Sequence, residues 1–229
     1  RKAKTIVWVV LAAVVLAGLI VGVVAASGPR DAAPQGSGQT ASSGTGQSAP
    51  SEATPVMRPD SRVLSKAPNE QAVLVEFLDF ECEACGAIYP VIEDLRRTYG
   101  DRVTFVVRYF PMPGHFNAER AARAVEAAAQ QGRFEQMYQR MFTTQTHWGE
   151  QQVPADDLFR SFAVDLDLDM AAFDTVYNSP AKLERIRADV ADGLALGVQG
   201  TPTFFLDENR LQPNTIDDLT AAVRAAASE

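Results

Sequence analysis

Cysteine, histidine and surplus positive charge are all scarce in this chain. Its 229 residues include two cysteines, Cys82 and Cys85, and two histidines. Two cysteines cannot build the dense disulfide framework of a small secreted scaffold, nor a zinc or iron–sulfur site with four thiolate ligands. The formal charge is −8. That balance argues against a general nucleic-acid-binding protein, which needs a basic face to displace counterions.

The first 26 residues differ in charge and polarity from the rest. Three basic residues lie within residues 1–5, and residues 6–26 then contain no charged or strongly polar side chain. As a helix this run would be about 31 Å long, enough to cross a bilayer. We expect a single-pass anchor at 6–26, residues 1–5 in the cytoplasm and the remaining chain outside it. A cleavable signal peptide is the alternative, although its apolar region is usually shorter.

Two further segments follow the expected anchor. Residues 27–54 contain no aromatic or large aliphatic side chain, so burial cannot offset the entropy lost on ordering them. We expect a flexible linker with an end-to-end distance of about 30 Å. Residues 55–229 hold 17 basic and 27 acidic residues, a charge of −10. This stretch is long enough for one globular domain of ordinary size.

The periodicity of the globular part predicts an α/β domain. Residues 72–79 form a nearly continuous apolar run, typical of a strand buried on both faces, and 103–110 resemble it. Residues 86–99 between them have helical spacing, so the two strands should be parallel. Further helices are expected from a cap at Asn117 to 131, from Phe134, from Pro154 and from a cap at Ser179 to about 196. A closing hairpin (203–206 with a weaker segment at 210–212) and a helix at 216–226 follow, the latter with a capping box of Thr215 and Asp218.

Both cysteines lie where the first predicted strand gives way to a helix. Cys82 falls near the helix N-terminus, where free N–H groups and the helix dipole favour an anion and lower a thiol pKa. A thiolate there could attack a disulfide, and Cys85, one turn further, could resolve the mixed disulfide. Glu76, an acid inside a buried strand, could take the proton from Cys85, with a pKa raised by burial. A glutamate at an edge or on the surface is the alternative for Glu76.

The residues around these cysteines resemble a known family. The run 75–85 (Val-Glu-Phe-Leu-Asp-Phe-Glu-Cys-Glu-Ala-Cys) and the run 200–205 (Gly-Thr-Pro-Thr-Phe-Phe) are similar to DsbA-like thiol–disulfide oxidoreductases of the thioredoxin superfamily, especially the membrane-tethered members. The resemblance implies a thioredoxin fold with a helical domain inserted at about 117–197. It also implies that Cys82 is the nucleophile, Cys85 the resolving cysteine and Glu76 the buried acid.

The same resemblance identifies Pro202 as a cis-proline beside the active site. A cis bond at Thr201–Pro202 costs little for an X–Pro peptide and would leave the Thr201 backbone free to pair with an extended substrate. The dipeptide between the cysteines departs from the best-known DsbA, where it is Pro-His and the histidine stabilises the thiolate. Here it is Glu83-Ala84. Because a carboxylate should disfavour the thiolate, we expect a weaker oxidant.

These inferences predict an extracytoplasmic enzyme of the cell membrane that introduces disulfides into secreted proteins. Its substrates would be reduced or misoxidised secreted proteins. The resemblance implies reoxidation by a quinone-linked membrane partner, and the expected redox group is the Cys82–Cys85 disulfide, with no other cofactor. A thiol reductase of the cytochrome c maturation type is the first alternative, and a non-catalytic binding module of the same fold is the second.

Zinc binding is the metal alternative. The possible ligands are Cys82, Cys85, His115 and His147, but the histidines are 32 residues apart, unlike the three to five of a zinc finger. We therefore expect no metal. His115 should pack or hydrogen-bond ahead of the following helix. His147 should close an apolar face together with Trp148, or else form a wall of the substrate groove.

Overall fold

A five-stranded mixed sheet lies at the centre of the part of the chain that the computed structural model describes, residues 54–228. The strand order is β1-β3-β2-β4-β5, and β2 and β3 are parallel, as predicted, while the other pairs are antiparallel. The strands are β1 (Arg62–Ser65), β2 (Ala72–Leu78), β3 (Val103–Tyr109), β4 (Thr203–Leu206) and β5 (Asn209–Arg210). The expected anchor at 6–26 and nearly all of the expected linker lie outside the described residues. Within the described range, no helix has the length and apolarity needed to cross a bilayer.

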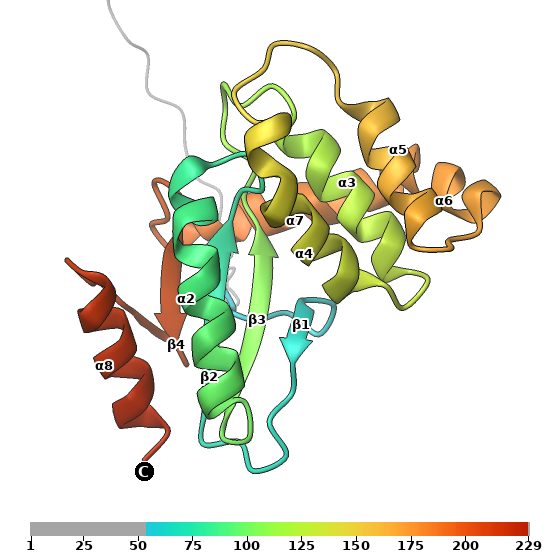
Figure 1. Cartoon of the computed structure of the whole chain (residues 1–229). Coiled ribbons are helices and arrows are strands. Elements are labelled where there is room, and N and C mark those ends of the chain that lie inside the picture. Colours follow the sequence, from blue (N-terminus) through green and yellow to red (C-terminus); the bar gives the residue numbers. More distant parts are fainter. Residues whose placement is uncertain (1–53, 229) are drawn as a thin grey trace, which may run out of the picture. The chain divides into compact units, whose positions relative to one another are not determined.

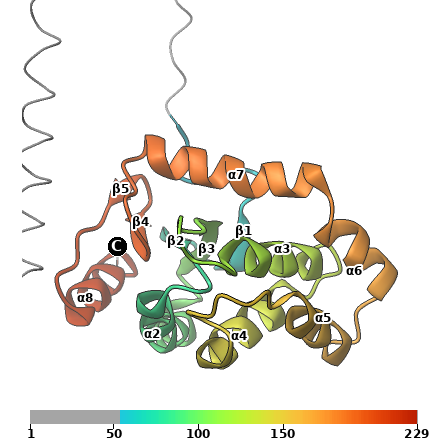
Figure 2. The same ribbon diagram turned by 90° about the horizontal axis from the view of Figure 1, so that it is seen from above.

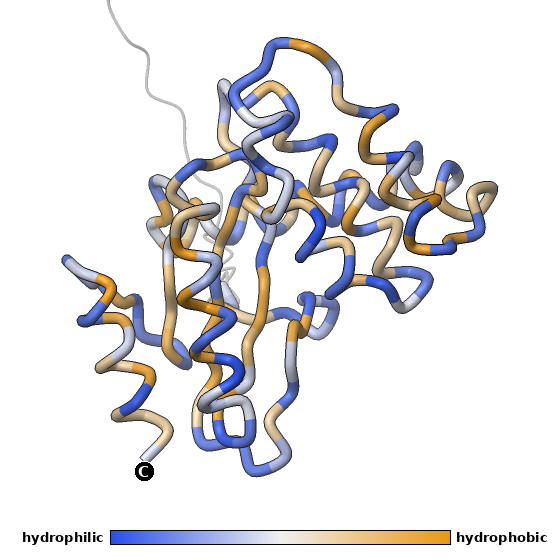
Figure 3. Tube along the Cα trace, in the orientation of Figure 1, coloured by the Kyte–Doolittle hydropathy of each residue, from blue (hydrophilic) through white to orange (hydrophobic). Residues whose placement is uncertain are grey.

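Helices cover both faces of the sheet. The long helix α7 (Pro180–Ala195) lies on one face, and α2 (Glu83–Tyr99) and α8 (Ile216–Ala226) lie on the other, as the view from above shows (Figure 2). Each face has its own apolar core, one containing Val75 and Phe77 and the other Leu74 and Leu78. Because β2 is buried on both sides, its sequence is apolar almost throughout, and the strands are mostly orange in the hydropathy view (Figure 3).

The inserted helices lie between β3 and β4. They gather beside the sheet at the end where the arrows of β2 and β3 point (Figure 1). The last of them, α7, also packs along the sheet, so the insertion contributes one layer of the thioredoxin-like core. The others are α3 (Ala118–Ala129), α4 (Phe134–Thr144), the short 3-10 helix η1 (Gln145–His147), α5 (Asp156–Asp165) and α6 (Met170–Tyr177).

Most of the predicted helix boundaries are confirmed. The hydroxyl of Ser179 accepts a hydrogen bond from the Lys182 N–H, and Thr215 and Asp218 form the predicted capping box. The helix expected from residue 86 begins three residues earlier, at Glu83. Three elements were not predicted, namely the edge strand β1, the short helix η1 and helix α6.

The predicted cap at Asn117 is wrong in its chemistry. Asn117 occupies the N-cap position of α3, but its side chain makes no capping hydrogen bond. Its amide donates instead to the carbonyls of Gln151 and Val153, at 3.3 and 3.0 Å, and its Oδ1 accepts from the Ala155 N–H at 3.0 Å. Asn117 therefore fixes the loop between η1 and α5, because a buried amide satisfies whichever backbone groups the tertiary fold brings to it.

Candidate redox site

Cys82 is the N-cap residue of α2 and lies at the carboxyl end of the central strand. Its backbone is extended (φ −66°, ψ 121°), and its half-buried thiol lies 3.3 Å from the Thr201 carbonyl oxygen. The pKa of Cys82 is lowered to about 5, chiefly by a hydrogen bond from the Cys85 thiol. The Thr201 side chain and the backbone N–H groups of Cys85 and Ala84 add to this effect, and burial opposes it. At neutral pH Cys82 is therefore a thiolate, the form that attacks disulfides.

Cys85 has the opposite environment. It is fully buried in the core that contains α2, and burial raises its pKa well above the usual value for a thiol. The hydrogen bond to Cys82 and the nearby Glu76 raise it further. Since its thiol stays protonated next to the Cys82 thiolate, the two cysteines have the distinct protonation states that a nucleophile and a resolving thiol need.

Glu76 lies in the middle of the sheet. It is 5% exposed and is paired with Val107 on β3 and with Phe204 on β4, so the alternative of an edge or surface position is wrong. Burial raises its pKa to about 8, with smaller contributions from the charges of Cys82 and Glu93. Glu76 therefore carries a proton at neutral pH and can exchange it in the range where Cys85 must gain or lose one.

The loop before β4 faces the nucleophile. The Thr201–Pro202 peptide bond is cis. The Thr201 carbonyl oxygen lies 3.3 Å from the Cys82 sulfur and accepts a hydrogen bond from it only while Cys82 is a protonated thiol. It is released when Cys82 ionises, since a thiolate has no proton to donate. The Thr201 hydroxyl is also buried beside the site, where it helps to lower the pKa of Cys82.

The two residues between the cysteines, Glu83 and Ala84, are both exposed. Glu83 lies in the first turn of α2, where a carboxylate interacts favourably with the helix dipole. Water and salt screen an exposed charge, so its effect on Cys82 is smaller than that of a buried group.

Two buried acids, Asp79 and Glu81, accept hydrogen bonds that fix the loop carrying Cys82. Neither of them was identified from the sequence. Asp79 accepts from the Glu81 N–H at 2.8 Å and from the Met112 N–H at 2.9 Å, and it pairs with His115 Nδ1 at 2.6 Å. Glu81 is 1% exposed and accepts from the Asn117 N–H at 2.6 Å. Together they join the active-site loop to the start of the insertion. The alternation of acids at 79, 81 and 83 was the available signal.

Gln145 is a third residue that the sequence did not reveal. It comes from η1, and its amide nitrogen lies 2.8 Å from the carbonyl oxygens of both Phe80 and Cys82. It follows the predicted helix from Phe134 by one residue, with no local pattern to mark it. Only the packing of the insertion against the active-site loop brings it to Cys82.

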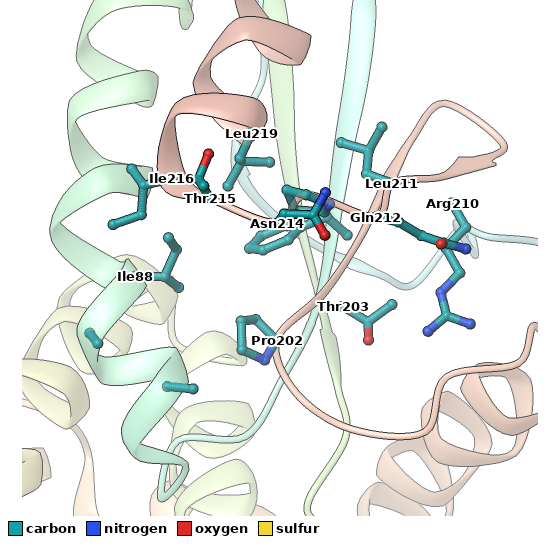
Figure 4. Close-up of a pocket in the computed structure, with 14 residues that line it drawn as sticks. Ile88, Pro202, Thr203, Arg210, Leu211, Gln212, Asn214, Thr215, Ile216 and Leu219 are labelled. Carbon is teal, nitrogen blue, oxygen red and sulfur yellow. The ribbon is translucent and has the colours of Figure 1, made fainter.

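An apolar groove of about 480 Å³ begins beside the cysteines. Its lining includes Ala84 of α2 and Pro202, and the groove continues between α2, the segment after β5 and the start of α8 (Figure 4). Ile88, Leu211, Ile216 and Leu219 supply much of its apolar wall, and Ile216 is half exposed. This surface can receive the apolar side chains of an extended peptide held near Cys82.

The predicted histidine roles are confirmed for His115 and wrong for His147. His115 pairs with Asp79, whereas His147 is exposed and does not close the apolar face. Trp148 does, since it is buried and packs edge-on against Phe159. No group of three or more potential metal ligands occurs in the described part of the chain.

Comparison with known proteins agrees with this geometry. The sequence model of a thioredoxin family, described as Thioredoxin, matches residues 65–225. The Na(+)/H(+) antiporter NhaA of Herminiimonas arsenicoxydans is 38% identical over 142 residues, which are 62% of this chain and 22% of the antiporter. The chain thus spans less than a quarter of the length of that relative.

Two solved structures have the same fold. Wolbachia pipientis α-DsbA1 superposes with a TM-score of 0.66 at 17% identity, covering 75% of this chain and 93% of that one. A thioredoxin-like oxidoreductase from Silicibacter pomeroyi DSS-3 has a TM-score of 0.63 at 24% identity, covering 78% and 98%. These similarities establish a DsbA-like fold, that is, a thioredoxin fold with inserted helices.

Proposed function

The chain belongs to the thioredoxin family, and we propose that it is a DsbA-like thiol–disulfide oxidoreductase that oxidises protein thiols through Cys82 and Cys85. The observation that carries this proposal is the contrast between the two thiols. Cys82 has a pKa of about 5, whereas Cys85 is fully buried and has a raised pKa. A non-catalytic module of the same fold would have no need of this contrast, nor of a buried acid beside it.

Oxidation of a substrate proceeds in two exchanges. A substrate thiolate attacks Sγ of Cys82 in the Cys82–Cys85 disulfide, the S–S bond breaks, and its electron pair goes to Cys85. Cys85 takes a proton, for which the protonated Glu76 is the nearby donor. A second substrate thiolate then attacks the substrate sulfur of the mixed disulfide, and Cys82 leaves as a thiolate. The substrate loses two electrons and the enzyme becomes the dithiol.

The low pKa of Cys82 favours the oxidising direction. A thiol with a low pKa is a good leaving group, and its stabilised thiolate favours the reduced enzyme over the disulfide. Oxidation of the substrate is then downhill, and an external oxidant must restore the disulfide. We assign that role to a quinone-linked membrane partner, and we expect the substrates to be reduced or misoxidised secreted proteins. The groove beside Pro202 supports a substrate bound in extended form.

We further propose that the domain works outside the cytoplasm, tethered by an anchor at residues 6–26. The 21 uncharged residues of that segment support the anchor. The antiporter relative supports a membrane setting too, because a similar domain there belongs to a membrane transporter. A reductase of the cytochrome c maturation type would occupy the same compartment, so the direction of electron flow separates the two functions.

The test compares oxidative refolding of a reduced, disulfide-containing protein by the wild type and by Cys82→Ser and Cys85→Ser variants. We expect the wild-type disulfide to be consumed stoichiometrically and Cys82→Ser to be inactive. Cys85→Ser has no disulfide to donate, so it should also leave the reduced substrate unoxidised. Given a disulfide-bonded protein instead, its Cys82 thiolate should attack that disulfide and accumulate as a mixed disulfide, because no resolving thiol remains. Equal activity of wild type and Cys82→Ser would overturn the enzymatic proposal. In cells, a Cys82–Cys85 pair trapped mainly as the dithiol would favour the reductase.

A further inference from the structure

The side chain of Gln145 connects the inserted helices to the backbone of the nucleophile. Its amide nitrogen donates to the carbonyl oxygens of Phe80 and Cys82, each at 2.8 Å, so both of its N–H groups are used. Gln145 itself is 8% exposed. We propose that Gln145 is a positioning residue for Cys82, which fixes the backbone on both sides of Glu81 and thereby sets where the Cys82 sulfur lies.

The two carbonyls need this partner. Phe80 is buried, and the chain from Asp79 to Cys82 is irregular, so the strand and helix ladders do not satisfy all of its backbone groups. The Cys82 carbonyl also accepts from the Gly86 N–H at 3.0 Å, but in this part of the chain Gln145 is the donor recorded for Phe80. A buried carbonyl without a donor is unfavourable, because it has lost its hydrogen bonds to water and gained none in the protein. Loss of the amide would therefore drive the loop to rearrange.

Gly86 provides an independent observation of the same arrangement. A Cβ added at Gly86 would lie 2.0 Å from Oε1 of Gln145 and 2.9 Å from its Cδ. The backbone does not demand glycine, since Gly86 lies within α2 and is not among the residues with positive φ. Inside a helix glycine is less favourable than alanine, because its backbone loses more conformational freedom on folding. The missing side chain at position 86 thus makes room for the Gln145 amide.

Displacement of the amide should change the chemistry at Cys82. The Cys82 thiolate is stabilised chiefly by the Cys85 thiol and also by the backbone N–H groups of Cys85 and Ala84, and these groups act only at hydrogen-bond range. If the loop shifts, these contacts lengthen and the thiolate is less well stabilised. Loss of a single hydrogen bond to a charged group corresponds to about one pKa unit or more.

The inference rests on the proposed function for its relevance, but its test does not depend on turnover. The ultraviolet absorbance of the Cys82 thiolate is titrated with pH in Gln145→Leu, with Gln136→Leu as the control. Gln136 is an exposed glutamine on the preceding helix, α4. We expect the thiolate titration to move upward by about one unit in Gln145→Leu and to stay in place in Gln136→Leu. The equilibrium with glutathione should move towards the disulfide in Gln145→Leu alone.

A double-mutant cycle with Gly86 separates positioning from general stabilisation. Gly86→Ala should expel the Gln145 amide, lower the melting temperature and raise the thiolate pKa as much as Gln145→Ala does. In the Gln145→Ala background the same Gly86→Ala change should raise the melting temperature, because only helix propensity remains.

Additive effects in this cycle, or an unchanged thiolate titration in Gln145→Leu, would overturn the proposal. A wild type that lacks oxidase activity but shows the predicted titration shifts would overturn the proposed function and leave the positioning role intact.

Discussion

Replacing Glu76 by glutamine should stabilise the domain, increasingly so as the pH rises. The carboxyl has an ordinary pKa of 4.5 in the unfolded chain and about 8 in the folded protein. Because the folded state binds this proton more tightly, folding is favoured at low pH, and the stabilisation is lost as pH rises from about 4.5 to about 8. Glutamine keeps a donor and an acceptor in the same space without an ionisable proton.

The magnitude follows from the two pKa values. At pH 7 the carboxyl is ionised in the unfolded chain and still protonated in the folded protein. This difference lowers the free energy of unfolding of the wild type by about 3 kcal/mol. The decrease in the free energy of unfolding reaches about 5 kcal/mol above pH 8 and vanishes below pH 4. For a domain of this size, about 3 kcal/mol corresponds to a melting temperature about 10 °C higher in Glu76→Gln at pH 7.

The assay is thermal unfolding of the reduced proteins between pH 4 and pH 9, with Glu208→Gln as the control. Glu208 is an exposed glutamate in the turn between β4 and β5. The melting temperatures of wild type and Glu76→Gln should diverge with pH, while Glu208→Gln follows the wild type. A difference that does not change with pH would refute the reasoning, since it would mean that the buried carboxyl titrates normally. The same variant should slow the first exchange, in which the mixed disulfide forms, because the leaving Cys85 loses its proton donor.

Two further predictions follow from the structure. The thiolate pKa of about 5 lies between those of DsbA (about 3.5) and thioredoxin (about 7), so interpolation places the reduction potential of Cys82–Cys85 at roughly −180 mV. Titration against glutathione buffers measures it, and a value near −120 or −270 mV would contradict the interpolation. Arg108→Met should destabilise the domain by about 3–5 kcal/mol, because the fully buried Arg108 pairs with Asp189 at 2.6 Å and Asp192 at 2.5 Å. Denaturant unfolding measures this loss of stability. A loss below about 1 kcal/mol would show that the ion pairs of Arg108 contribute little to the stability of the fold.

The sequence predicts the core of this fold because its signals there are local. The apolar run at 72–79, the Ser179 cap and the Thr215–Asp218 capping box each involve residues close in the chain, and the structure contains all three. The edge strand β1 was not predicted, because it has only four residues and pairs with β3 on one side only. A segment that short carries too little alternation to be recognised.

The site is predictable to the same extent. Cys82 and Cys85 are marked by spacing and by their place at a helix start, and Glu76 by a charge inside an apolar strand. Gln145 and Asn117 act on backbone groups far from them in sequence, so no local pattern marks them. Their roles depend on how the insertion folds back over the active-site loop.

The described chain begins on the side of the sheet that carries α7. Arg108 donates to the carbonyls of Val56 and Pro55, at 2.8 and 3.3 Å, and Arg58 pairs with Asp192 of α7. The groove beside Pro202 lies on the opposite side, between α2 and α8. The groove and the first described residues thus lie on opposite faces of the sheet. With the anchoring proposed above, a substrate bound in the groove would not compete for space with the start of the described chain.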